Sequence, residues 1–222
     1  MISSTRSETS LHPSRQLDLY VGLANVFHQV DNTLDVHMVF SRDGHNWTRT
    51  NKRQPFLNNG PSNSWDQYQV AVPSTPITIN DKTLIYYGGS NTHHDWWITG
   101  PRENLDIPEA KDTSLVFHGI GVAEIGYDRY ISLETNDLRE GLLVTKPLQT
   151  GNKHLTVNGQ CNENGYISIE LLAENGEIIN GFSKNDSKGF LGNSIEHEYE
   201  WTNPNKQTLS DWVILRIWMK SS

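Results

Sequence analysis

Short runs in which apolar and polar residues alternate recur along the whole chain and are separated by turn-forming residues. In the first half they predict strands at Leu17–Phe27, Leu34–Phe40, Val70–Ile79, Thr83–Tyr87, His118–Gly126 and Tyr130–Leu133. Alternation with a period of two is typical of half-buried β-strands. Pro73 and Pro76 interrupt the third run, because proline cannot donate to a sheet ladder. The pattern predicts two antiparallel meanders in succession.

The second half of the chain has the same kind of pattern with a different spacing. Its apolar runs predict strands at Gly141–Pro147, His154–Val157, Tyr166–Ala173, Ile195–Trp201 and Trp212–Met219. Short strands at regular intervals, with turn signals between them, are typical of a β-sandwich. We place the boundary between the two halves near Glu134–Glu140.

Together these patterns predict an all-β chain in three parts. Residues 1–16 are polar and lack a hydrophobic period, so we expect a disordered lead-in. Residues 17–133 contain two similar strand–turn–strand units, which is the pattern of successive propeller blades and predicts a partial β-propeller of about two blades. Residues 134–222 form the predicted β-sandwich. Two blades cannot close a propeller, so we expect unpaired blade edges and possible self-association through them.

The segment from Ser41 to Trp47 is the strongest local turn signal in the chain. Gly44 follows Asp43, and glycine enters the positive-φ region that tight turns require. The side chains of Ser41 and Asp43 are short enough to accept hydrogen bonds from the turn's own amides. Trp47 either folds back over the hairpin or is exposed to solvent; the turn alone does not decide between these.

Composition excludes several classes of partner. The chain has 222 residues and a formal charge of −8, which argues against a nucleic-acid surface, because such surfaces need clustered lysine and arginine. No apolar run approaches the eighteen or so residues of a membrane span. Cys161 is the single cysteine, so no internal disulfide is possible, and we interpret it as a small, partly buried residue. The polar N-terminus is not a secretory signal, and the localisation stays open.

Several segments of the first half resemble a known family. Ser41–Trp47, Arg53–Phe56, Gly60–Asp66 and Leu84–Gly89 look like the late blades of five-bladed propeller glycoside hydrolases of the invertase, fructanase and arabinanase type. The second half resembles the β-sandwich appended to such propellers, and the matching segments are Gly121–Ala123, Gly141–Pro147, Ile169–Gly176 and Gly181–Ser183.

The resemblance implies a function, and it also implies that the catalytic blades of the family are missing from this chain. Such a propeller needs roughly 250 to 300 residues before its sandwich, judging from four strands per blade, and the early catalytic blades have no counterpart in this chain. The resemblance therefore implies a glycoside hydrolase-like protein that acts on or binds an oligosaccharide. The alternatives are a non-catalytic carbohydrate-binding or structural fragment and an inert truncated product. No cofactor is implied.

Asp66 is the best candidate for a catalytic carboxylate. Glycosidic cleavage needs two carboxyl groups, about 5 Å apart for retention or about 6.5–9.5 Å apart for inversion. Asp66 follows Trp65 in the sequence. The resemblance implies that this position lines the family's pocket and that Trp65 would contact the substrate. The alternative interpretation is that Asp66 caps a turn at the start of its blade.

The long polar loop after Gly89 carries the remaining candidates. Asp95 is the second candidate carboxylate, and Trp96 and Trp97 would bind the C–H face of a sugar while His93 and His94 hydrogen-bond its hydroxyls. The alternative is a solvent-exposed loop whose tryptophans pack on the neighbouring blade. Adjacent histidines rarely converge on one ion, so no metal site is predicted here.

His28 ends a predicted strand just before a polar loop. It is a candidate substrate-binding residue if it faces the opening of the pocket. The alternative is a loop histidine that is exposed to water.

Overall fold

The computed structural model describes residues 10–14, 19–98, 107–135, 139–151, 154–203 and 205–221. The fold is all-β with several sheets, none of them closed, which confirms the predicted fold class at this level. The chain divides into two compact units, Met1–Tyr127 and Asp128–Ser222. In the described part of the chain no helix is long and apolar enough to cross a membrane.

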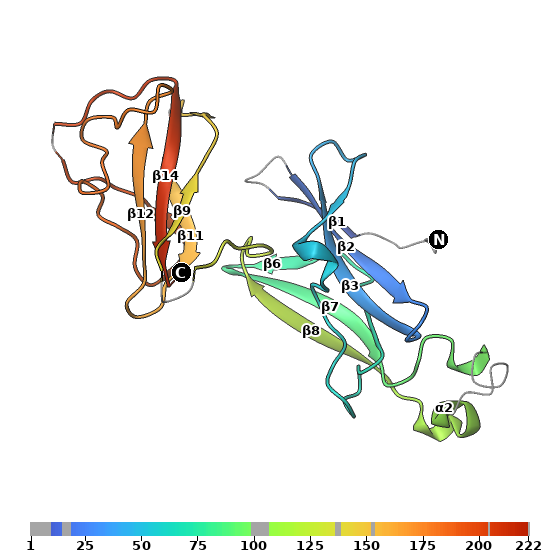
Figure 1. The fold of residues 1–222 in the computed structure, drawn as a ribbon. Coiled ribbons are helices and arrows are strands. Elements are labelled where there is room, and N and C mark those ends of the chain that lie inside the picture. The colour runs from blue at the N-terminus through green and yellow to red at the C-terminus, as the bar shows by residue number, and fades with distance from the viewer. Residues whose placement is uncertain are drawn as a thin grey trace. The chain divides into compact units, whose positions relative to one another are not determined.

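The N-terminal unit contains most of the strands (Figure 1). Its strands are β1 (Ser10–Ser14), β2 (Leu19–His28), β3 (Thr33–Ser41), β4 (Thr48–Arg49), β5 (Gln69–Ala71), β6 (Ile77–Ile79), β7 (Lys82–Ser90) and β8 (His118–Gly126). Its short helical segments are the 3-10 turns Asn51–Arg53 and Thr113–Leu115 and the helix α2 (Pro108–Lys111).

Strands β1 to β4 form an antiparallel meander. β2 and β3 pair continuously from Tyr20 opposite Ser41 to His28 opposite Thr33. The predicted lead-in is wrong for Ser10–Ser14, because this segment pairs with β2 as strand β1. The pairing uses main-chain groups, which need no hydrophobic period in the sequence. The rest of residues 1–16 lies outside the described residues.

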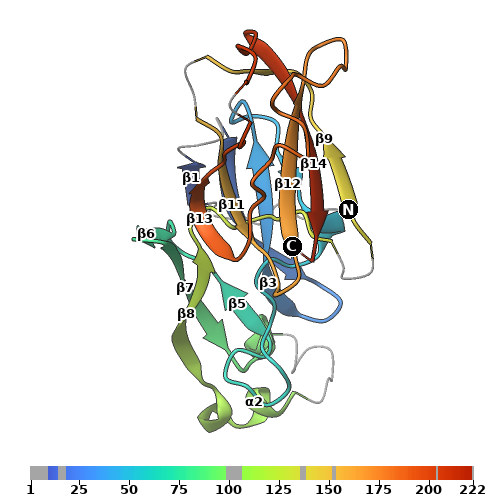
Figure 2. The same cartoon turned by 90° about the vertical axis from the view of Figure 1, so that its left-hand side faces the viewer.

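Strands β5 to β8 form a second antiparallel group. β5 and β6 lie along one edge of β7, and β8 pairs with the other edge (Figure 2). The break between β5 and β6 contains the two prolines, as the sequence predicts. The predicted strand Tyr130–Leu133 is wrong: this segment pairs with no described strand, and Ile131 and Leu133 are exposed.

Both groups contribute buried apolar side chains, and backbone and side-chain hydrogen bonds join them. Leu23 and Met38 are cross-strand partners on β2 and β3, and they are buried together with Val70, Val72 and Ile85 from the second group. A parallel bridge between Leu34 and Gln69 links the groups through the backbone. The Asn25 side chain also bonds both the amide and the carbonyl of Val72, at 2.9 and 3.3 Å.

The Ser41–Trp47 turn has the hydrogen bonds that its sequence predicts. The amides of Asp43 and Gly44 donate to Ser41 Oγ, and the amides of His45 and Asn46 donate to Asp43 Oδ1. Gly44 has a φ of +73°, as expected. The amide and side chain of Asn46, with the His45 amide, hold the pKa of Asp43 well below its usual range. Trp47 folds back far enough for its Nε1 to donate to the Gly44 carbonyl, at 3.2 Å.

The C-terminal unit is built on β14. Its strands are β9 (Gly141–Val144), β10 (Leu148–Gln149), β11 (Thr156–Gln160), β12 (Tyr166–Leu172), β13 (Asn193–Glu198) and β14 (Trp212–Lys220). β12 pairs with one edge of β14, and β9 and β10 pair with the other edge (Figure 1). β11 and β13 form a separate pair with a bulge between Val157 and Gly159.

The core of this unit is dominated by aliphatic and aromatic side chains. It contains Cys161, Ile167, Ile169, Leu171, Ile179, Phe182, Phe190, Tyr199, Trp201, Val213 and Leu215. The polar atoms that are buried with it are paired: Tyr199 Oη accepts from the Ile169 amide, and Trp201 Nε1 donates to the Ile169 carbonyl. Burial raises the pKa of the Cys161 thiol, consistent with a packing role.

Candidate functional site

Asp66 lies in a turn before β5 and is held by three neighbours. Ser64 Oγ donates to its Oδ1 at 2.8 Å, and the Tyr87 hydroxyl donates to its Oδ2 at 3.1 Å. The Gly60 amide donates to its main-chain carbonyl. Only 9% of Asp66 is exposed. Both carboxylate oxygens therefore have a side-chain donor within the protein.

Trp65 packs on the glycine-lined face of β7 and β8. Its ring stacks on Tyr87 with centroids 5.7 Å apart and meets Phe117 edge-on. A Cβ atom built on Gly89 or Gly119, which face each other across the two strands, would lie 2.7 or 2.9 Å from the indole ring. Trp65 is therefore a packing residue as well as a partly exposed aromatic surface.

His93 is fixed by two residues that are distant in sequence. Its Nδ1 lies 2.8 Å from Glu109 Oε1, its amide donates to the same oxygen at 3.1 Å, and its ring stacks on Tyr68. Burial alone raises the pKa of Glu109, but the hydrogen bonds from His93 outweigh burial and lower that pKa overall. Glu109 is thus an ionised, buried partner that orients the imidazole.

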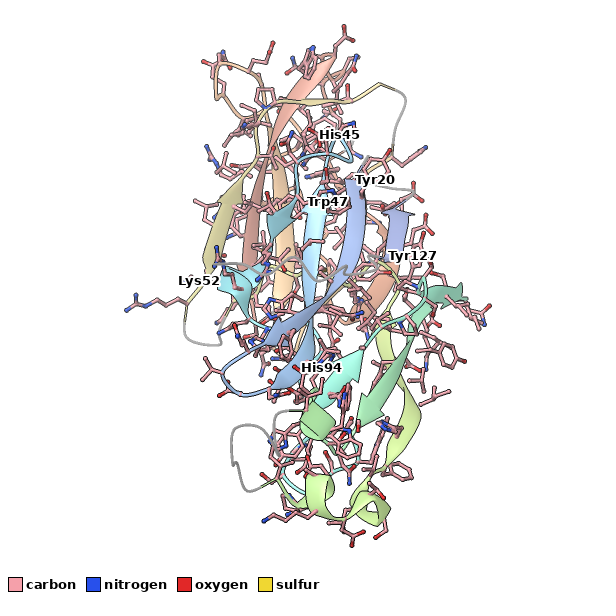
Figure 3. The ribbon with its side chains drawn as sticks, turned by 90° about the vertical axis from the view of Figure 1, so that its right-hand side faces the viewer. Tyr20, His45, Trp47, Lys52, His94 and Tyr127 are labelled. Carbon is pink, nitrogen blue, oxygen red and sulfur yellow. The ribbon has the colours of Figure 1, made fainter. Side chains whose placement is uncertain are left out.

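His94 and Asp95 dock the loop onto the turn between β2 and β3. The His94 amide donates to the Asn32 carbonyl at 2.8 Å, and the Asp95 amide donates to Asn32 Oδ1 at 2.7 Å. His94 Nδ1 lies 2.7 Å from Asp95 Oδ1, and its ring contacts Phe27. Figure 3 shows His94 at this end of the hairpin, away from the end that carries Trp47.

Trp96 and Trp97 end the described part of the loop. Their rings are perpendicular, with centroids 5.9 Å apart. Trp96 is half-buried, whereas 55% of Trp97 is exposed. The pair therefore presents an aromatic edge to solvent beside the His94–Asp95 pair.

A second group of titratable residues lies on β2 and β3. His28 Nε2 lies 2.9 Å from Asp35 Oδ2, and His37 Nε2 lies 3.1 Å from Asp35 Oδ1. Asp35 and His37 are buried, and 36% of the His28 side chain is exposed. One ligand atom from each residue can be chosen so that all three lie within 4.8 Å of one another. Of the described residues, these three form the one such group able to hold a metal ion.

The electrostatics of this cluster favour neutral imidazole at its buried end. Burial lowers the pKa of His37, and the opposing attraction of Asp35 does not overcome it. The charges of Arg49 and His28 act in the same direction as burial. A neutral imidazole carries a lone pair on one nitrogen, which is the form that binds metal ions.

The structure brings some of the predicted residues together and separates others. His93 to Trp97 form one surface at the β2–β3 turn, and His28 precedes the same turn. Asp66 and Asp95 share no hydrogen-bond partner in the part of the chain that the structure describes. Sequence reasoning missed Asp35, His37, Tyr68 and Glu109. The Asp35-x-His37 spacing was a usable signal, because residues two apart on a strand share a face.

Comparison with known proteins assigns no family. No protein-family model matches the sequence, and a search of curated proteins finds no match.

Proposed function

We propose that this protein binds an oligosaccharide through the surface formed by the loop from His93 to Trp97. The observation that carries the proposal is the exposed edge of Trp97 beside the His94–Asp95 pair, on a loop anchored through both main-chain and side-chain atoms of Asn32. An anchored loop presents its side chains in one arrangement, so less conformational entropy is lost on binding.

The chemistry of this surface fits a sugar. An aromatic ring packs against the apolar C–H groups of a pyranose or furanose, and imidazole and carboxylate groups hydrogen-bond its hydroxyls. His94 and Asp95 are about one-third exposed, so they have capacity for such bonds. The contacts of His93 with Glu109 and Tyr68 fix the start of this loop.

Binding without hydrolysis is the form of the proposal that the candidate carboxylates support. Hydrolysis needs one carboxyl group that can donate a proton to the substrate and a second across the scissile bond. Asp66 is buried and has donors on both oxygens, so neither oxygen is presented to a ligand. Asp95 is engaged with His94. Both candidate carboxylates, Asp66 and Asp95, therefore have hydrogen-bond partners within the protein.

We further propose that the N-terminal unit is part of a β-propeller. Its strands belong to one eight-stranded sheet, in which two antiparallel groups are joined through the parallel Leu34–Gln69 pair, and each group has the strand–turn–strand order of a blade. One face of β7 and β8 exposes apolar side chains: Ile120 and Val122 are 83% and 54% exposed, and Tyr86 is 43% exposed opposite Val122. A neighbouring blade would cover such a face, so a second copy of the chain is the proposed partner.

A glycan array and a panel of aryl glycosides test the sugar proposal. We expect glycan binding without turnover, with binding lost in Trp97→Ala. Trp212→Ala is the matched control, because Trp212 is a comparably exposed tryptophan in the other unit. Absence of glycan binding by the wild-type protein would contradict the proposal, and turnover that disappears in Asp66→Asn would replace it with a hydrolase.

Sedimentation velocity tests the self-association proposal separately. We expect a concentration-dependent dimer that Val122→Lys weakens, because a charge in the centre of the apolar face must be desolvated on pairing. A wild-type protein that stays monomeric at all concentrations would contradict it.

A further inference from the structure

We propose that His28, Asp35 and His37 form a binding site for one divalent transition-metal ion of the Zn²⁺ type. Two imidazoles and a carboxylate are a donor set that suits zinc, and three protein ligands leave a position for water. The proposal is independent of the sugar-binding surface and rests on three observations about this cluster.

The first observation is the placement of the ligands by strand register. Asp35 and His37 are two residues apart on β3, so they point to the same face of the sheet. Across the hairpin, Val26 pairs with Asp35 and His28 pairs with Thr33, which puts His28 on that face one step further along. A continuously paired hairpin therefore holds all three side chains, and no loop rearrangement is needed to assemble them.

The second observation is the spacing of the ligand atoms. A tetrahedral zinc ion about 2.0–2.2 Å from each ligand holds neighbouring ligand atoms roughly 3.3 Å apart. The carboxylate oxygens lie 2.9 Å from His28 Nε2 and 3.1 Å from His37 Nε2. The three ligand atoms fall within 4.8 Å of one another, so a small rotation of the partly exposed His28 closes the set around an ion.

The third observation is that the two histidine–Asp35 ion pairs lack good hydrogen-bond geometry, although a hydrogen bond to Asp35 still raises the pKa of His37 against the larger effect of burial. His28 Nε2, Asp35 Oδ1 and both ring nitrogens of His37 are buried and have no hydrogen-bond partner among the described residues. By contrast, the His93–Glu109 and His94–Asp95 contacts, at 2.8 and 2.7 Å, do have hydrogen-bond geometry. Buried polar atoms are normally paired. The ring nitrogens of His28 and His37 that face Asp35 can therefore each offer a lone pair to a shared ion.

Direct metal titration of the full-length chain tests the proposal. After chelation and desalting, the wild type is titrated with ZnCl₂ in a calorimeter and with CoCl₂ in a spectrophotometer. We expect one zinc per chain and a visible absorbance band from bound Co²⁺. Zinc at 100-fold excess over its Kd should raise the midpoint of thermal unfolding by about 5–10 °C.

Substitutions identify the ligands. His37→Gln and His28→Gln should each weaken zinc binding by more than the roughly 10–100-fold that loss of an outer-shell partner costs. His118→Gln, which removes an exposed histidine from β8, should leave it unchanged. His28→Gln is the decisive variant if His37→Gln fails to fold, because His28 is partly exposed near the strand end.

Three results would overturn the proposal. One is a wild-type chain that takes up no stoichiometric zinc. Another is a cobalt complex whose spectrum is unchanged by His28→Gln. The third is zinc binding that His94→Gln abolishes while His28→Gln retains it, which would assign the ion to the loop histidines instead.

Discussion

Two buried carboxylates, one in each unit, differ in how completely their oxygens are hydrogen-bonded. Glu170 on β12 accepts from Arg216 Nη1 at 2.7 Å and from the Lys184 amide at 3.1 Å, so both of its oxygens are bonded. Asp35 on β3 has an imidazole beside each oxygen, but its Oδ1 has no hydrogen-bond partner among the described residues. A carboxylate with complete hydrogen bonding is a structural element, whereas an incomplete one is suited to bind something else.

The two units also differ in the apolar side chains that they bury. The C-terminal unit encloses a continuous core in which Tyr199 and Trp201 bond the backbone of β12. Among the described residues, the N-terminal unit buries fewer apolar side chains. Both units also expose some, such as Ile120 and Val122 on β8 and Leu142 and Val144 on β9. The exposed apolar face of β7 and β8 is the one that the proposed self-association would bury.

The largest expected effect is in the C-terminal unit. Arg216→Ala leaves Glu170 buried and without its counter-ion, and we expect a loss of about 3 kcal/mol in the free energy of unfolding. This is the lower end of the usual cost, because the Arg216 side chain is 32% exposed. Urea unfolding followed by tryptophan fluorescence measures it.

The matched control for Arg216→Ala is an exposed ion pair. Lys82→Ala breaks the ion pair between Lys82 and Glu124. The side chains of both residues are about half exposed, so this variant should lose much less stability than Arg216→Ala. If both variants lose the same free energy of unfolding, the ion pair of Glu170 contributes no more than an exposed one. Glu170 could then not serve as the fully bonded carboxylate with which Asp35 is compared.

A smaller effect is expected where Trp65 packs on β7. Gly89→Ala places a methyl group 2.7 Å from the Trp65 ring and from the Asp66 side chain, and overpacking of this kind costs about 1–3 kcal/mol. Gly88→Ala is a control on the neighbouring residue, because a Cβ there meets nothing within 4 Å. If Gly89→Ala unfolds at the same urea concentration as Gly88→Ala, Asp66 and Trp65 are loosely held, and Asp66 returns as a candidate for catalysis.

Sequence alone predicted the strands whose side chains alternate against a core. β8 was predicted with its observed bounds, and β7, β12 and β14 within a few residues, because each is a continuous run of strand-forming residues that pairs along its length. β1 was missed because its pairing with β2 leaves no side-chain pattern. Tyr130–Leu133 has the alternation of a strand, but alternation does not supply a partner edge.

The candidate site was less predictable than the fold, since its contacts cross between elements. Glu109 lies sixteen residues from His93, and nothing local indicates that the two meet. His28 lies beside Asp35 and His37 only because of the register in which β2 pairs with β3. The sequence does not give this register, because it does not fix where the two strands end and begin. The Ser41–Trp47 turn was predicted in detail because its bonds join residues two or three apart.

Tyr87→Phe is expected to cost about 1 kcal/mol near neutral pH, by removing the donor to Asp66 Oδ2. Burial, together with the hydrogen bond to Asp66, raises the pKa of Tyr87 above its ordinary value of about 10. The folded protein thus keeps this proton to a higher pH than the unfolded chain. Its contribution to stability is complete below about pH 10 and is lost as the pH rises through the raised pKa.

The pH dependence supplies the measurement for Tyr87. The stability difference between wild type and Tyr87→Phe, measured by urea unfolding, should be constant up to about pH 10 and narrow above it. A difference that widens at alkaline pH would show that Asp66 does not hold the protonated hydroxyl.

The smallest expected effect bears most directly on the comparison. In metal-free buffer at pH 8, Asp35→Asn should change the free energy of unfolding by less than about 1 kcal/mol. Its Oδ1 accepts no hydrogen bond from the described residues, and the buried charge that the substitution removes is costly to keep. With zinc present, the wild type should gain stability that Asp35→Asn lacks, because the ion binds only the complete ligand set. If Asp35→Asn without metal costs as much as Arg216→Ala, Asp35 is as fully bonded as Glu170, and the two carboxylates do not differ in the way proposed.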